Sequence, residues 1–167
     1  MEKVLYSEKE KSIAFTGHRI IPLVRQEEVR ARLTAAVTLV CKLGMTRFYC
    51  GMALGFDMMA AEVVLSLKDK FSDIQLIAVV PFSRQSSRWA SSEQERYYRI
   101  LAKTDKVVTL SENYFRGCLL RRNDYMLSHS SGVIAYFDGK PKGGTSYTVR
   151  KAERMKMNVV NIYGQRG

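Results

Sequence analysis

Short apolar runs alternate along this chain with longer segments whose apolar residues recur at helical spacing. Residues 74–80 form an almost uninterrupted apolar run that ends at Pro81, which is typical of a strand buried on both faces. Residues 26–43 instead place Val29, Leu33 and Val40 on one side of a helix. The same alternation continues to the end of the chain. It predicts strands at residues 12–16, 47–50, 74–80, 106–110, 133–137 and 158–163, and helices at residues 26–43, 57–68, 92–103, 118–129 and 145–155.

Strands that alternate with helices favour a parallel sheet, because each parallel pair needs a crossover and buries both sheet faces. We therefore predict a doubly wound α/β fold with a mainly parallel six-stranded sheet and helices on both faces. The length of 167 residues fits one domain, which we assign to residues 12–167, behind a polar leader at residues 1–11. In such sheets ligands bind beyond the carboxyl ends of the strands, where the strand order reverses. The segments that follow the strands are therefore the candidates for function.

The composition is that of an ordinary globular protein, with 46% hydrophobic and 26% charged residues. No apolar run approaches the roughly 18–20 residues that a membrane helix needs, and the amino terminus lacks the apolar block of a secretion signal. The three cysteines fit neither a disulfide framework nor paired metal ligands, and the chain has two histidines. The sequence therefore predicts a cytoplasmic protein that binds no metal and no membrane.

The formal net charge of +11 is unevenly distributed along the chain. Residues 81–167 hold 16 basic and 7 acidic side chains, whereas residues 1–80 hold 11 and 9. This asymmetry indicates an anionic partner, either a phosphate-bearing small molecule or nucleic acid. The alternative is that Lys and Arg only keep the surface solvated.

Two of the segments after strands combine glycine with cationic side chains. Thr16, Gly17, His18 and Arg19 follow the first strand, where glycine permits a close approach and the cations can reach a phosphate or carboxylate. The segment after the fifth strand contains the strongest local signal. Its members are Asp138, two lysines, Gly143, Gly144 and Thr145, the last three at a helix start where amides can bind phosphate. An ordinary turn remains the alternative at both places.

The turn after the second strand places Gly51, Gly55 and Asp57 before a helix, so that its amides can also face an anion. It matches neither the G-x-G-x-x-G fingerprint nor a Walker A loop. Asp57 can either cap the helix or bind a ligand hydroxyl.

Aromatic and amide side chains follow the third and fourth strands. Gln85 and Trp89 would share one face if their segment is helical, and such a pair can stack on a base and read its edge. Packing of Trp89 against the loop is the alternative. Tyr114 is a second stacking candidate, and one of the neighbours Arg121 and Arg122 is expected to face the site.

Together these segments resemble the YpsA-like family of the SLOG superfamily, whose Rossmann-like domains include the DNA-processing protein A group and the LOG phosphoribohydrolases. The resemblance covers about residues 12–163, and it is carried by residues 16–19, 51–57, 81–89, 122–123 and 138–145. It implies a Rossmann-like sheet and a site for a nucleotide or nucleotide-derived ligand, and it adds Arg122 and Asn123 to that site.

One departure from the LOG enzymes concerns catalysis. Their Pro-Gly-Gly-x-Gly-Thr loop is closely followed by a glutamate that serves N-glycosidic bond cleavage. Here Gly144 and Thr145 are followed by no carboxylate until Glu153. The resemblance thus implies the phosphate-binding half of the loop without its catalytic half. The catalytic residues stay unassigned, with Asp57 and Asp138 as the carboxylates that could substitute.

Our leading hypothesis is that the protein binds a nucleotide or nucleotide-derived phosphate ligand, as a sensor, with no other cofactor. Phosphate would rest on Gly143, Gly144 and Thr145, with Gly51 and Gly55 opposite. Two alternatives stay open: a hydrolase of nucleoside-phosphate N-glycosidic bonds, and a protein that binds single-stranded nucleic acid through its basic second half. A homo-oligomer is compatible with each.

Overall fold

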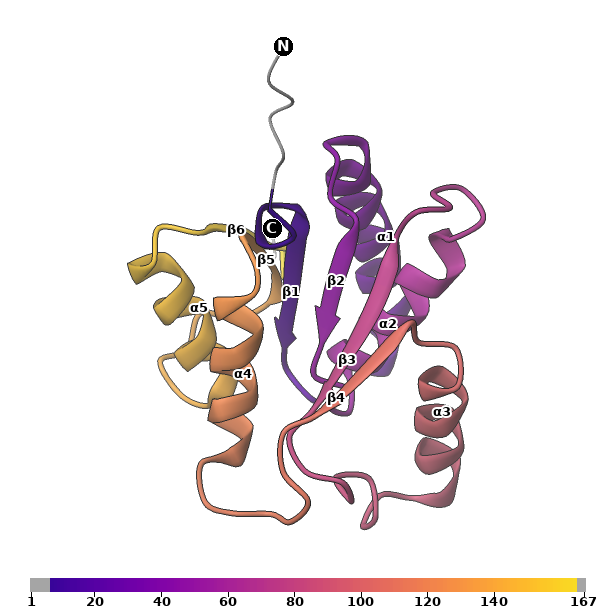
Figure 1. The fold of residues 1–167 in the computed structure, drawn as a ribbon, viewed down its shortest axis with the longest axis vertical. Helices are drawn as coiled ribbons and strands as arrows, with labels where there is room; N and C mark the ends of the chain where they lie inside the picture. The colour runs from indigo at the N-terminus through magenta and orange to yellow at the C-terminus, as the bar shows by residue number, and fades with distance from the viewer. Residues whose placement is uncertain (1–6, 165–167) are drawn as a thin grey trace.

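The computed structural model describes residues 7–164 and shows a six-stranded sheet with the strand order β4-β3-β2-β1-β5-β6 (Figure 1). All neighbouring strands pair in parallel, which confirms the predicted α/β Rossmann-like fold. The strands are β1 (Ser12–Gly17), β2 (Arg47–Cys50), β3 (Gln75–Val80), β4 (Lys106–Thr109), β5 (Gly132–Tyr136) and β6 (Asn158–Asn161). The α-helices are α1 (Gln26–Lys42), α2 (Phe56–Leu67), α3 (Ser91–Leu101), α4 (Cys118–Ser128) and α5 (Gly144–Arg154), and two 3-10 helices are η1 (Lys9–Lys11) and η2 (Leu23–Arg25).

The direction of the chain across the sheet reverses after β4. From β1 to β4 each strand is added on one side of its predecessor, and β5 then returns to pair with β1 on the other side. Because right-handed crossovers in opposite directions place their helices on opposite faces, α1, α2 and α3 cover one face while α4 and α5 cover the other (Figure 1). The switch point of the fold therefore lies between β1 and β5.

The register of β1 and β5 brings their carboxyl ends to the same level. Thr16 pairs with Ala135 and Gly17 pairs with Tyr136, so the loops that leave these two strands start side by side. The apolar faces of the strands are filled by large side chains, among them Phe15 and Phe48, whose rings stack at 5.8 Å. This packed core fixes the positions of the loops at the switch point.

The strands and helices start and end within a few residues of the bounds predicted from the sequence. The last strand ends at Asn161 rather than at residue 163, because the Asn161 side chain binds the backbone of Phe137 and Tyr163. The shared helical face considered for Gln85 and Trp89 is not formed. Their segment consists of turns, and α3 starts only at Ser91.

Residues 1–6 of the predicted leader lie outside the described residues. The part that follows contains η1 and is bound to the amino ends of two strands. Ser12 donates its hydroxyl to the Glu8 carbonyl, and Ser131, just before β5, donates its hydroxyl to the Glu10 carbonyl. In the described range 7–164, no helix combines the length and apolarity needed to cross a bilayer.

Candidate functional site

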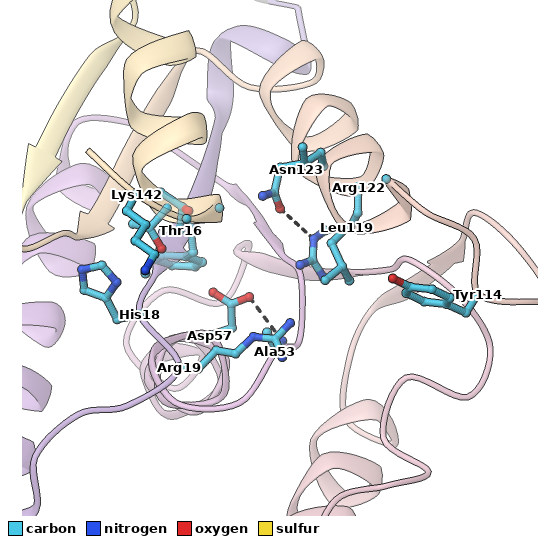
Figure 2. A pocket seen from close by; sticks show the side chains of 17 residues that line it. Thr16, His18, Arg19, Ala53, Asp57, Tyr114, Leu119, Arg122, Asn123 and Lys142 are labelled. Atoms are coloured by element: carbon cyan, nitrogen blue, oxygen red, sulfur yellow. Dashed lines mark hydrogen bonds between the residues drawn. The ribbon is translucent and has the colours of Figure 1, made fainter. Parts of the chain in front are cut away.

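A pocket of about 430 Å³ opens at the switch point, beyond the carboxyl end of β1 (Figure 2). The loop after β1 forms one side, and the amino-terminal turns of α2, α4 and α5 form the others. Many of the predicted site residues line it. They are Thr16, Gly17, His18, Arg19, Asp57, Tyr114, Arg122, Asn123, Gly143, Gly144 and Thr145. Residues that lie up to 129 positions apart in the sequence are thus brought to one cavity because the parallel strands end at the same edge.

The start of α5 presents backbone amides to this pocket. Gly143 has a φ of 92° and precedes the helix without a side-chain cap. Among the described residues, the amides of Gly144 and Thr145 have no hydrogen-bond acceptor. Unpaired amides in the first helical turn carry the positive end of the helix dipole, so this rim of the pocket favours an anion.

Three cationic side chains add to the positive electrostatic potential that the start of α5 creates in the pocket. Arg19 and Lys142 are exposed, and within residues 7–164 neither charged group has an ion-pair or hydrogen-bond partner. Arg122 is 4% exposed and is bound in place: it donates to the Gly51 carbonyl at 2.6 Å and to the Asn123 side-chain oxygen at 2.8 Å. Of the two neighbouring arginines, Arg122 therefore faces the pocket, while the exposed Arg121 donates to the Leu110 carbonyl at 3.3 Å.

Asp57 is the acidic side chain of the pocket. It lies in the first turn of α2 and is 5% exposed. Its Oδ2 accepts the Ala53 amide at 3.2 Å, whereas its Oδ1 is buried without a partner in the described structure. Burial raises the pKa of Asp57 to about 6, against the opposing effects of Arg122, the Ala53 amide and Arg19. Near neutral pH this carboxyl can therefore both accept and donate a proton.

His18 is held at the pocket by the loop after β5. Its Nε2 accepts the Asp138 amide at 2.9 Å, and its own amide donates to the Tyr136 carbonyl at 3.3 Å. Asp138 does not line the pocket. Its Oδ1 accepts the Lys140 amide at 3.0 Å, which is the main cause of its lowered pKa, with His18 contributing. The Asp138 carboxylate therefore orders the loop from a position outside the pocket lining.

The glycines after β2 support the pocket from behind and do not line it. Gly55 has a φ of 79°, and a Cβ at this position would collide with the backbone of Arg19. A Cβ on Gly51 would come within 2.7 Å of the Arg122 guanidinium. The space beside Gly51 and Gly55 is thus filled by the protein's own chain.

Gln85 and Trp89 also lie outside the pocket lining. Gln85 donates to the Gly51 carbonyl and to the Tyr97 hydroxyl, both at 3.3 Å. Trp89 packs edge-to-face against Tyr97 with ring centroids 5.3 Å apart and contacts the main core cluster. The packing alternative therefore describes Trp89, and Gln85 braces the glycine turn after β2.

Several lining residues were not among the predicted ones. Lys142 directly precedes the Gly143–Gly144 pair, and this position was the available signal for it. Ala53 contributes the amide that holds Asp57, which no side-chain pattern indicates. The other unpredicted lining residues reach the pocket because of the orientation of β1 and α4, which the sequence pattern does not give. They are Phe15, Gly117, Leu119 and Leu120. No cluster of three His, Cys, Asp or Glu able to hold a metal ion occurs within residues 7–164.

The fold and the pocket define a Rossmann-like domain with a cationic, amide-lined cavity at its switch point. The YpsA family model, described as the YspA SLOG family, matches residues 13–163, and the chain belongs to this family. The resemblance found in the sequence is thereby confirmed.

Curated relatives of the chain come from bacteria. The UPF0398 protein BH1768 of Halalkalibacterium halodurans is 31% identical over 66% of this chain, which spans 60% of that relative. A UPF0398 protein of Bacillus pumilus is 26% identical, with 86% of this chain and 82% of the relative covered. The SPbeta prophage-derived protein YoqJ of Bacillus subtilis is 29% identical, with 76% and 81% covered.

Two solved structures share the fold. The single-stranded DNA-binding DNA processing protein A of Helicobacter pylori superposes with a TM-score of 0.62 at 18% identity, covering 89% of this chain and 63% of its own. The protein TM1055 superposes with a TM-score of 0.55 at 13% identity, covering 89% and 71%. At these identities the likeness concerns the architecture.

Proposed function

We propose that the switch-point pocket binds a nucleotide or nucleotide-derived ligand through its phosphate. The observation that carries the proposal is the meeting of unpaired α5 amides with Arg19 and Lys142 in one cavity of about 430 Å³, where neither cation has a hydrogen bond or ion pair with a described residue. Because amides and cations face the same space, an anionic group there would receive hydrogen bonds and charge compensation together.

The other side chains of the pocket suit the rest of a nucleotide. Asp57 has a free buried oxygen that can accept a hydrogen bond from a ribose hydroxyl. Tyr114 is 64% exposed at the pocket edge and offers an aromatic face to a base. The fold relative from Helicobacter pylori binds single-stranded DNA, which supports a ligand built from nucleotides. Such a ligand also agrees with the predicted cytoplasmic location.

A second candidate function is hydrolysis of the N-glycosidic bond of a nucleoside phosphate. The raised pKa of Asp57, about 6, favours it, because a carboxyl that titrates near neutral pH can serve as a general acid or base. Glycoside hydrolysis commonly uses two carboxylates, and Asp57 is the acidic member of the described pocket lining. We therefore rank binding first. Release of free base or ribose phosphate, lost in Asp57→Asn, would establish the hydrolase instead.

The proposal is tested by the melting temperature of the protein with 5′-mononucleotides and with the matching nucleosides. We expect each nucleotide that binds to raise the melting temperature, and the nucleosides, which lack phosphate, to raise it much less. Ligand at about 100 times its dissociation constant stabilises the folded state by about 2.7 kcal/mol. Calorimetric titration then gives the dissociation constants.

A matched pair of lysine variants assigns the binding to this pocket. Lys142 lines it, whereas Lys140 is exposed on the same loop and does not. Lys142→Ala should weaken nucleotide binding roughly fivefold, about 1 kcal/mol, while Lys140→Ala should change it by less than about twofold. Equal effects of the two variants, or no nucleotide that binds at all, would refute the proposal.

A further inference from the structure

A second cavity, also of about 430 Å³, lies at the same edge of the sheet, between the loops after β3 and β4. We define it by Phe82, Arg84, Gln85, Arg88, Glu112 and Tyr114, which are among its lining residues. The switch-point pocket and this cavity share Tyr114. The two cavities are therefore neighbours that have one exposed aromatic side chain in common.

Tyr114 is oriented so that it can serve both cavities. Phe82 packs edge-to-face against its ring with centroids 5.4 Å apart, which supports the ring from the side of the second cavity. Figure 2 shows the Tyr114 hydroxyl directed toward Arg122, on the side of the switch-point pocket. With 64% of its surface exposed, the ring keeps area available for stacking.

The polar groups of the second cavity also suit a nucleotide unit. Arg84 and Arg88 are exposed, and their guanidinium groups have no ion pair or hydrogen bond with any residue that the structure describes. Two unpartnered guanidinium groups in the lining of one cavity attract phosphate. Glu112 can accept hydrogen bonds from the amino group of a base. Cations, an acceptor and an aromatic pair thus occur together here as well.

We propose that the ligand contains two nucleotide units joined through phosphate, one in the switch-point pocket and the other in the second cavity, with Tyr114 between them. This proposal rests on the proposed function, because it extends the ligand of the same site. It assigns Phe82, Arg84 and Arg88 to the second unit. A dinucleotide with a 5′–5′ pyrophosphate bridge and a single strand with 3′–5′ linkages share this chemistry.

The experiment compares the dissociation constants of three adenine ligands by calorimetry: AMP, the 3′–5′ dinucleotide pApA and the 5′–5′ dinucleotide diadenosine diphosphate. We expect at least one dinucleotide to bind roughly tenfold or more tightly than AMP, since the contacts of Arg84 and Arg88 with the second unit are charge-assisted and one such contact has that scale. Preference for pApA identifies a single strand as the source, and preference for diadenosine diphosphate identifies a pyrophosphate-bridged dinucleotide.

A double variant locates the second unit. Arg84→Ala with Arg88→Ala should lower the dinucleotide affinity to that of AMP and leave AMP binding within about twofold. The control is Arg99→Ala with Lys103→Ala, which removes the same charge from exposed positions at the end of α3, outside the second cavity. This control should keep the dinucleotide preference, because loss of net charge alone acts on all anionic ligands alike.

The possible outcomes separate the two proposals. If AMP binds but neither dinucleotide binds more tightly, or if the preference survives in the Arg84/Arg88 variant, the second subsite is refuted and the proposed function stands. If none of the three ligands binds at millimolar concentration, both proposals fail for adenine nucleotides. A tighter dinucleotide that loses its advantage only in the Arg84/Arg88 variant establishes the two-unit ligand.

Discussion

Two glycine turns of the described structure lead from a buried strand into a helix, and they differ in whether protein atoms fill the space beside the glycines. After β2, the space beside Gly51 and Gly55 is filled by Arg122 and by the backbone of Arg19. After β5, the space beside Gly143 is empty to 4 Å, and beside Gly144 the nearest atom is the Asn123 Nδ2 at 3.8 Å. The first turn is closed by the protein itself, whereas the second is open toward the pocket.

The two turns therefore contribute different groups to one site. The closed turn buries Asp57 and anchors Arg122 through the Gly51 carbonyl, so it supplies fixed side chains. The open turn supplies backbone amides and the exposed Lys142. A glycine turn at the carboxyl end of a strand thus indicates an anion site only where no side chain or backbone of the protein already occupies it.

The largest effect is expected for Gly55→Ala in the closed turn. An added Cβ would meet the Arg19 backbone, and the φ of 79° is itself unfavourable for alanine. We expect a loss of about 2–4 kcal/mol in the free energy of unfolding, measured by urea denaturation. A loss below about 1 kcal/mol would mean that the turn can move, and the distinction between the closed and the open turn would then fail.

Asp57→Asn tests the buried charge that the closed turn carries. Burial raises the pKa of Asp57 to about 6 from its ordinary value of 3.8, so the folded state binds this proton more tightly than the unfolded state. The contribution of Asp57 to stability is then greatest below about pH 4 and decreases as the pH rises to about 6. A shift of about two pH units corresponds to about 3 kcal/mol.

Asparagine retains an acceptor for the Ala53 amide but has no charge to bury. The free energy of unfolding of Asp57→Asn relative to the unaltered protein should therefore rise by up to about 3 kcal/mol between about pH 4 and pH 7. Urea denaturation at four pH values across this window measures it. The control is Asp138→Asn, because the Asp138 carboxyl of the unaltered protein has a lowered pKa. The free energy of unfolding of this variant relative to the unaltered protein should therefore fall, not rise, as the pH increases through the acid range. A flat difference for Asp57 would show that its carboxyl is solvated.

The sequence predicts the fold because the strands and helices are recognisable one at a time. Uninterrupted apolar runs such as residues 74–80 become central strands, and their carboxyl ends must share an edge. This is also why Thr16, Asp57 and Thr145 could be expected at one site. Which glycine turn is open could not be predicted, since it depends on where the distant Arg122 side chain lies.

The same limit applies to Gln85 and Trp89, which lie outside the lining of the switch-point pocket. Trp89 packs edge-to-face against Tyr97, on the following helix. Gln85 is drawn to the Gly51 carbonyl, 34 positions away in the chain. Both outcomes depend on contacts between separate elements, which the local sequence pattern does not contain.

The smallest effect on stability is expected for Gly144→Ala in the open turn, although its effect on binding should be large. Gly144 lies outside the left-handed region, and an added Cβ would make only an ordinary contact, at 3.8 Å, with the Asn123 amide nitrogen. Because alanine is favourable in a helix, the free energy of unfolding should change by less than about 1 kcal/mol.

The new methyl group would nevertheless project into the space in front of the α5 amides, where we place the phosphate. Nucleotide binding should therefore weaken by roughly tenfold or more in calorimetric titrations, whereas the melting temperature without ligand should stay close to that of the unaltered protein. Unchanged binding in a folded Gly144→Ala variant would show that the open turn does not hold the phosphate.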